Sequence, residues 1–404
     1  MGKKYDIGII GAGISGAFAA LRAAENHRKA SVIIFDLGRP PGKRRRQLEG
    51  WLGCFPTGDA KIRVNDVEYI RDTVDGRTAR HANNWIMNHL KEIGPFKVTY
   101  DKLPQPSVQK QISTAGFEII KNDYIQWKPD SVHKLSRVIA DKLEEAGNVE
   151  FSFDNEVFTI TKQKRHFIIG TTEGDYWCRK IILCVGRSGW RWVSKLYEDL
   201  GLSVHDDLAK YGIRVEMPTQ YLKEYNKSHC SLIRSDLSIG PFCFNGTIIP
   251  EDHADLAISA FRSNENRWKS DKVSFKIIGN RLFKGRGIYE TDRLGKLAFL
   301  QFNDRIGRER VKNLVKKRSL LSDIPEYNWL IETVEELESF IPNIINRGYF
   351  HVPTISPIAA PIRLGSNLET ELEGMFVAGE SAGFPGIGSA AISGAIAIDG
   401  ALKK

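Results

Sequence analysis

One segment near the amino end has the residue types and spacing of a phosphate-binding turn: Gly11-Ala12-Gly13-Ile14-Ser15-Gly16. It follows the apolar stretch 5–10 and opens the stretch 14–24, whose apolar residues recur at helical spacing, so the glycines stand between a predicted strand and a predicted helix. In that setting the first glycine permits a tight turn, the second lets the backbone approach a pyrophosphate, and the third lets helix and strand pack closely. The helix amino terminus adds unpaired N–H groups. The pattern predicts a dinucleotide site.

An acid follows at the distance that such a site needs. Asp36 ends the next apolar segment, 31–35, with 19 residues between it and Gly16. A carboxylate in this place can accept hydrogen bonds from the hydroxyls of an adenosine ribose. Leu37 and Arg39 come directly after it, and we include both in the predicted site. NAD and FAD share this pattern, so it does not decide between them.

The carboxyl end carries a second glycine-rich segment. An apolar stretch, 374–378, ends in Gly379-Glu380 and is followed by Gly386-Ile387-Gly388 and a run of small residues over 389–401. The arrangement resembles the closing strand and helix of flavoproteins with the glutathione-reductase fold. That resemblance implies that Glu380 lies on the ribityl chain or pyrophosphate, and that the helix terminus presents N–H groups to the pyrimidine side of the flavin. It favours FAD.

The middle of the chain supplies the remaining strands of such a domain. A strand is predicted at 148–151, and a β-meander opens at 155–160, continues through 166–169 and returns at 180–186. We expect Val157 to offer backbone contacts to adenine and Gly186 to begin the turn where the chain leaves the domain.

With these segments together, the chain resembles, nearly end to end, a largely uncharacterised family of FAD-dependent dehydrogenase-like proteins. The segments that carry the resemblance include Gly50-Trp51-Leu52-Gly53, 185–190, Ala360-Pro361-Ile362-Arg363 and 376–383. The family usually has a glycine-rich stretch ending Ser-Asp-Gly-Lys where this chain has the segment 54–61, so we expect a different backbone path there.

The resemblance implies an α/β fold. It consists of a glutathione-reductase-type, Rossmann-like FAD-binding domain, built on a parallel sheet with a β-meander, and an inserted mixed α+β substrate domain. The FAD-binding domain is expected to be discontinuous, over 1–65, 125–190 and 351–404. A helix-rich insert at 66–124 and a substrate or cap domain at 191–350 make up the rest.

Three side chains in regions predicted near the flavin could take part in catalysis. His351 would titrate near neutrality and move a substrate proton, or it is a structural histidine. Cys54 would be a thiolate if Lys61 lies beside it, or an inert apolar residue. Arg363 would anchor a substrate carboxylate or the charge of the reduced flavin, or form a surface salt bridge.

Two absences in the sequence narrow the chemistry. The chain has no second G-x-G-x-x-G for NAD(P)H, and its five cysteines include no C-x-x-C pair, so it lacks the usual equipment of a disulfide reductase or a zinc site. We expect an FAD-dependent oxidoreductase, a dehydrogenase or reductase that transfers hydride between flavin and a C–C or C–N bond of a small substrate. A flavin monooxygenase is an alternative, although Gly186-Arg187-Ser188 replaces its Asp-Gly motif. A non-enzymatic or RNA-handling FAD protein is another.

Composition sets the expected partners. With 42% hydrophobic and 26% charged residues, the chain has the balance of a globular protein and not of a disordered one. The 58 basic and 49 acidic residues give a net charge of +9, which favours an anionic small-molecule substrate. A separate electron donor or acceptor is needed. We expect no nucleic-acid partner, because basic runs are usually solvated faces.

No apolar run reaches the roughly 20 residues of a membrane span. The cysteine usage suggests the cytoplasm.

Overall fold

The computed structural model divides into two compact units, each with its own apolar core. The first comprises Met1–Val98, Ile125–His205 and Ile358–Lys404, and the second comprises Thr99–Tyr124 and Asp206–Pro357. The structure describes residues 3–40, 43, 61–63, 67, 70–92, 96–126, 129–253, 255–263, 270–356 and 362–403.

The first unit is built on a sheet that changes from parallel to antiparallel. The parallel strands are β7 (Val149–Ser152), β2 (Val32–Phe35), β1 (Lys4–Ile10), β10 (Gly174–Leu183) and β20 (Met375–Val377). The beginning of β10 pairs antiparallel with β9 (His166–Thr171), which pairs with β8 (Val157–Gln163). One long strand therefore belongs to both the parallel sheet and the meander.

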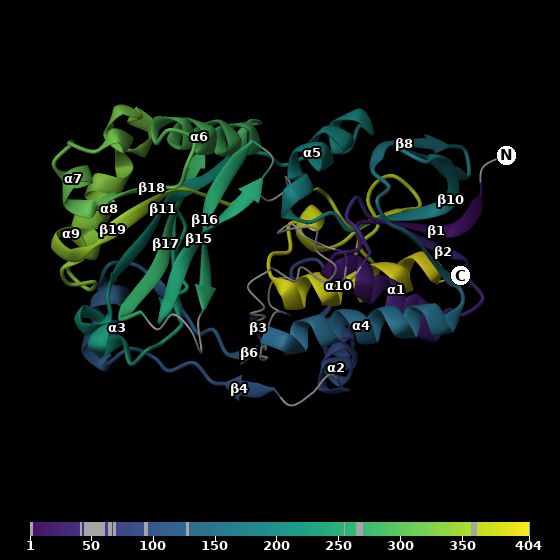
Figure 1. The fold of residues 1–404 in the computed structure, drawn as a ribbon, viewed down its shortest axis with the longest axis horizontal. Helices are drawn as coiled ribbons and strands as arrows, with labels where there is room; N and C mark the ends of the chain where they lie inside the picture. The colour runs from purple at the N-terminus through teal and green to yellow at the C-terminus, as the bar shows by residue number, and fades with distance from the viewer. Residues whose placement is uncertain are drawn as a thin grey trace. The chain divides into compact units, whose positions relative to one another are not determined.

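The helices of this unit include two that cross very closely, α1 (Ile14–Asn26) and α10 (Ile387–Leu402), which lie side by side in Figure 1. A Cβ atom on Gly394 would overlap the carbonyl oxygen of Ser15, so α10 needs glycine at the crossing. The other elements of this unit are β3 (Lys61–Arg63), α2 (Gly76–Glu92), α4 (Pro129–Ala146) and α5 (Trp190–Asp199). No described helix has both the length and the apolar character to cross a bilayer.

The second unit is a largely antiparallel sheet with helices on its apolar face. The strands follow the order β18 (Gly307–Arg310), β19 (Tyr349–Ile355), β11 (Leu208–Pro218), β17 (Lys272–Leu282), β13 (Leu237–Ile239), β12 (Ser231–Arg234) and β5 (Glu118–Ile120), and β14 (Cys243–Phe244) also pairs with β17. The helices are α3 (Pro106–Thr114), α6 (Gly287–Gln301), α7 (Val311–Val315), α8 (Trp329–Leu337) and α9 (Ile344–Arg347). A separate hairpin joins β15 (Gly246–His253) to β16 (Leu256–Ser263). The predicted fold class, α/β with a parallel sheet and meander and a mixed α+β second part, is confirmed.

The unit boundaries differ from the expected domain boundaries. Residues 66–98 and 191–205 belong to the first unit, and 351–357 belong to the second. The expected insert is divided, because α2 lies in the first unit and α3 in the second. The chain passes from one unit to the other at β4 (Lys97–Thr99) and returns at β6 (Tyr124–Gln126).

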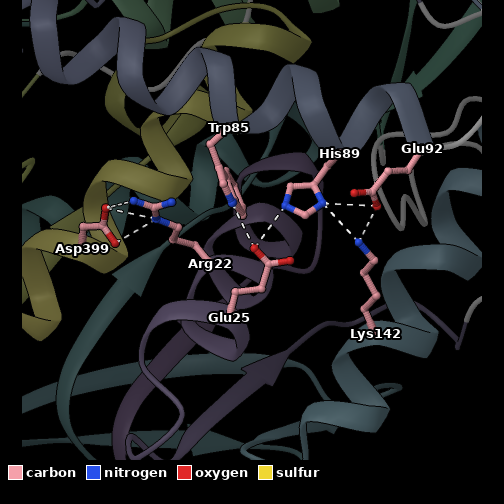
Figure 2. Close-up of polar contacts among 7 residues, drawn as sticks. All are labelled: Arg22, Glu25, Trp85, His89, Glu92, Lys142 and Asp399. Atoms are coloured by element: carbon pink, nitrogen blue, oxygen red, sulfur yellow. Dashed lines mark hydrogen bonds and ion pairs between the residues drawn. The ribbon is translucent and has the colours of Figure 1, made fainter.

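A polar network attaches α2 to its neighbours in the first unit (Figure 2). One carboxylate oxygen of Glu25, on α1, accepts a hydrogen bond from Trp85 Nε1 at 3.0 Å and lies 3.1 Å from His89 Nε2. On the other side of the imidazole, Lys142 of α4 lies 3.3 Å from His89 Nδ1 and donates to Glu92 at 2.5 Å. Glu25 thus joins two half-buried ring N–H groups to α1.

We predict that Glu25→Ala lowers the free energy of unfolding by about 1–2 kcal/mol, because it leaves the indole N–H without its acceptor in a place where water replaces it poorly. Urea unfolding followed by tryptophan fluorescence measures the change. Lys195→Ala is the control, since it breaks an exposed pair with Asp199 within α5 and should leave the midpoint unchanged. Equal shifts in both variants would contradict the role of the network.

Candidate dinucleotide site

Four parallel strands of the first unit end at one edge and are connected there by backbone hydrogen bonds. Gly11 N donates to Phe35 O at 2.8 Å, Cys184 N donates to Ile10 O at 2.8 Å, and Ala378 N donates to Leu183 O at 2.9 Å. The four segments that follow β1, β2, β10 and β20 therefore all leave the sheet at this edge. Ligands of open α/β sheets bind at this carboxyl edge, where the strand order reverses, as it does on the two sides of β1.

The turn after β1 requires glycine at two positions. Gly11 has a φ of +100°, and a Cβ atom there would lie 2.7 Å from the carbonyl oxygen of Cys184. A Cβ atom on Gly16 would overlap the carbonyl oxygen of Gly11. Gly13 is the N-cap of α1, and neither a side-chain cap nor an acid in the first turn covers the helix terminus. The first-turn N–H groups, which have no partner within a helix, can therefore receive an anion.

The carboxylate of Asp36 joins the end of β2 to this turn. Its Oδ2 accepts a hydrogen bond from Ala12 N at 2.7 Å, and its Oδ1 accepts one from Gly38 N at 2.8 Å. A carboxylate oxygen has two lone pairs, so each can accept more than one hydrogen bond. Leu37 is 68% exposed and Arg39 is exposed beside it.

The start of the meander lies next to this carboxylate. The backbone N–H of Asn155 donates to the carbonyl oxygen of Asp36 at 3.2 Å, and that of Asp154 donates to Gly38 at 3.1 Å. Two residues further on, Val157 begins β8 and is half-buried. The structure thus brings Val157 into the neighbourhood of Asp36, where its predicted contact with adenine requires it.

Glu380 is held by a partner that the sequence analysis did not single out. Its Oε1 lies 2.8 Å from Nη2 of Arg187, and the two side chains are 17% and 28% exposed. Arg187 follows Gly186 after β10, and Glu380 follows Gly379 after β20. The sequence does contain a signal for this pair, since Arg187 is a cation soon after a strand. Its partner Glu380, however, lies 193 residues further along the chain.

A second open helix terminus follows Glu380. Gly386, with a φ of 95°, is the N-cap of α10, which has no side-chain cap and no acid in its first turn. The hydroxyl of Ser389 donates to Pro385 O at 2.5 Å, which fixes the chain before the helix. Ile387 is half-buried and Gly388 is buried. Glycine is the N-cap of both α1 and α10, as Gly189 is of α5, and a helix amino terminus of this kind can accept negative charge.

The three catalytic candidates belong to different parts of the chain. Cys54 lies outside the described residues. Arg363 is an exposed residue of the first unit, and it helps to lower the pKa of Glu371, although hydrogen bonds from Ser203 contribute more. His351 belongs to β19 of the second unit and is 7% exposed.

His351 differs from the expectation that it titrates near neutrality. Burial, and then the charges of Arg308, Arg214 and Lys272, lower its pKa from 6.5 to about 3. Its Nε2 has no hydrogen-bond partner. The imidazole is therefore neutral at physiological pH.

The comparisons with known proteins find distant structural likenesses. No protein-family model and no curated protein matches the chain. Among solved structures, glycine oxidase from Geobacillus kaustophilus is 14% identical, with 98% of this chain and 94% of that chain covered and a TM-score of 0.42. NikD, an unusual amino acid oxidase essential for nikkomycin biosynthesis, is 14% identical over 99% and 94%, with a TM-score of 0.39. CtdE in complex with FAD is 14% identical over 99% and 83%, also at 0.39.

We predict that acid destabilises the protein partly through His351. The unfolded chain takes up this proton near pH 6.5 and the folded chain only near pH 3, so the contribution of His351 is fully present above pH 6.5 and decreases as the pH falls. At pH 4.5 the loss should reach about 2–3 kcal/mol. Urea midpoints at pH 7.5 and 4.5 measure it. His351→Gln should lose less stability over this range than the unaltered protein, and equal losses would contradict the lowered pKa.

Proposed function

We propose that the first unit binds FAD and that the protein is an FAD-dependent oxidoreductase. The observation that carries the proposal is the joining of the glycine turn 11–16 to the carboxylate of Asp36 at the carboxyl edge of a parallel sheet. The residues fit such a group, because the turn has no room for side chains at Gly11 and Gly16 and its helix terminus has no capping side chain.

The second glycine-rich segment supports FAD over NAD. A dinucleotide with adenosine at one end needs the turn and Asp36, and these two are common to both cofactors. Glu380 with Arg187, and the uncapped terminus of α10 at Gly386, add polar groups for the other half of a longer ligand. An isoalloxazine ring gains negative charge when it is reduced, and helix N–H groups stabilise that charge.

In this proposal each residue has a separate task. The N–H groups of residues 13–16 hold the pyrophosphate, Ala12 N keeps its hydrogen bond to Asp36, and Asp36 accepts hydrogen bonds from the adenosine ribose. Val157 contacts adenine through its backbone, and Leu37 and Arg39 border the adenosine. Glu380 accepts a hydrogen bond from the ribityl chain, with Arg187 fixing its rotamer.

FAD supplies two-electron hydride chemistry, so we propose a dehydrogenase or reductase acting on a C–C or C–N bond of a small substrate. A separate electron donor or acceptor completes the cycle. Arg363 remains a proposed contact for a substrate carboxylate, and its exposure leaves it accessible to one. No contact among the described residues favours a monooxygenase or an RNA-handling protein.

We predict that the purified protein releases noncovalent FAD on acid or heat treatment. Gly11→Val should empty the site, because a side chain would strike the carbonyl oxygen of Cys184 and the left-handed backbone would be strained. Asp36→Ala should weaken binding by about 1–3 kcal/mol through lost ribose hydrogen bonds. Chromatography of the released flavin and titration of apoprotein measure both effects. Release of FMN alone, or no flavin after supplementation with FAD, would overturn the proposal.

We predict that Glu380→Gln and Arg187→Gln change the same property. Each variant breaks the 2.8 Å ion pair, so each should weaken FAD binding or shift the flavin reduction potential by a similar amount. The double variant should show little more loss than either single variant. Arg363→Ala is the control, since it removes an exposed cation from the same unit and should leave FAD occupancy unchanged. Additive effects of the two single variants would show that Arg187 does not act through Glu380.

A further inference from the structure

Basic side chains line up across four strands of the second unit. The register pairs Arg308 with His351, His351 with Arg214, and Arg214 with Lys276, from β18 through β19 and β11 to β17. Directly paired residues in an antiparallel sheet point to the same face, so these four side chains share one face. We call this set, Arg308, His351, Arg214 and Lys276, the basic row.

The face with the basic row is opposite to the apolar core of the unit. Val215, Phe350 and Ile277, which are sequence neighbours of the row, are fully buried members of that core. Because successive residues of a strand point to opposite faces, the row points away from the helices that cover the core. The hydrogen bond from Arg214 Nε to Ser259 O, at 3.3 Å, shows that β16 reaches this second face.

One carboxylate lies beside the row. Oε2 of Glu216 is 2.9 Å from Lys272 Nζ, 3.7 Å from Arg308 Nη2 and 3.9 Å from His351 Nε2. Arg214, which is buried, donates to the hydroxyl of Ser274 at 3.1 Å. Arg308, Arg214 and Lys272 are therefore the cations whose charges act on His351, and Glu216 lies among them.

His351 indicates that this face is built for a ligand. It is 7% exposed, and its buried Nε2 has no hydrogen-bond partner, since Glu216 at 3.9 Å is beyond hydrogen-bond distance. A buried polar atom without a partner costs free energy, and a ligand that supplies the partner recovers it.

The exposed fractions of these side chains show how a ligand could reach the histidine. The side chains of Lys272 and Arg308 are 45% and 46% exposed, whereas those of Glu216 and His351 are 10% and 8% exposed. Two solvent-accessible cations thus stand at the rim, and the unpartnered imidazole lies deeper. A ligand whose negatively charged group is attracted to the rim can reach the imidazole with a second polar group.

We propose that the basic row and Lys272 bind a small organic anion that carries two negatively charged groups. Adjacent strands are about 4.8 Å apart, so Arg308 and Arg214, two strands apart, are separated by about 10 Å of sheet. That span suits two anionic groups separated by a few bonds better than it suits a single carboxylate. The site lies within the second unit alone, and it does not depend on the flavin proposal.

Isothermal titration of the full-length protein tests the site with defined probes. Succinate and glutarate represent dicarboxylates, 3-phosphoglycerate represents a phosphorylated acid, and acetate at equal ionic strength is the monoanion. We expect one saturable site per chain for at least one dianion, with acetate at least about tenfold weaker, because it forms fewer charge-assisted hydrogen bonds. Binding of the phosphorylated acid alone would identify the dianion as a phosphate ester, and binding of the dicarboxylates alone would identify it as a dicarboxylate.

Variants at the rim and at the imidazole locate the site. Arg308→Gln and Lys272→Gln change exposed side chains, so both should fold, which circular dichroism checks, and together they should weaken the dianion at least about tenfold. His351→Gln keeps a polar group of similar reach and should weaken it less than His351→Leu does. Lys316→Gln removes the same charge from an exposed position at the end of α7 and should leave affinity unchanged.

Three results would overturn the proposal: no saturable binding of any dianion, acetate binding as tightly as the dianions, or an equal loss in Lys316→Gln and in the rim variants. The same titrations on a flavin-free preparation separate this site from the proposed flavin site, because loss of flavin should leave the dianion affinity in place.

Discussion

The first turn of α1 is held against two other segments of the chain at distances that only glycine allows. Gly16 brings the helix against the carbonyl oxygen of Gly11, and Gly394 brings α10 against the carbonyl oxygen of Ser15. Gly379 adds a third close approach, since a Cβ atom there would lie 2.8 Å from the hydroxyl oxygen of Ser15. Segments more than 350 residues apart are thereby held at one helix turn. Both halves of the proposed FAD site depend on this packing.

This constraint explains why part of the site was predictable from the sequence. The glycine turn, Asp36 and the terminus of α10 are local features, because each depends on a strand, a turn and a helix that follow one another directly. The pair Arg187 and Glu380 was missed because it depends on β20 pairing with β10, which brings the ends of two distant strands together. Strand pairing of this kind leaves no mark on the residues next to either side chain.

The pKa of His351 was likewise not predictable from the residues next to it in the sequence. Its sequence neighbours, Phe350 and Val352, indicate a buried strand, and a structural role was one of the two interpretations. The groups that lower its pKa lie on three other strands: Arg308 on β18, Arg214 on β11 and Lys272 on β17. The domain boundaries differ for a related reason, since they depend on which distant segments pack together. Residues 191–205 follow the turn at Gly186, yet they pack with the first unit.

The strand register shows which basic residues lie together, and these are mostly not the ones that form runs in the sequence. The net charge of +9 suggested an anionic ligand, and the most visible basic segments are the runs at 43–46 and 308–318. Among the cations of the basic row and Lys272, only Arg308 belongs to a run, whereas Arg214, Lys272 and Lys276 stand apart, each next to an apolar residue of a buried strand. A run of adjacent charges on a strand divides between two faces, but charges on neighbouring strands meet on one face when they are paired. The proposed anion site therefore depends mainly on isolated cations within apolar strands and not on the conspicuous basic runs.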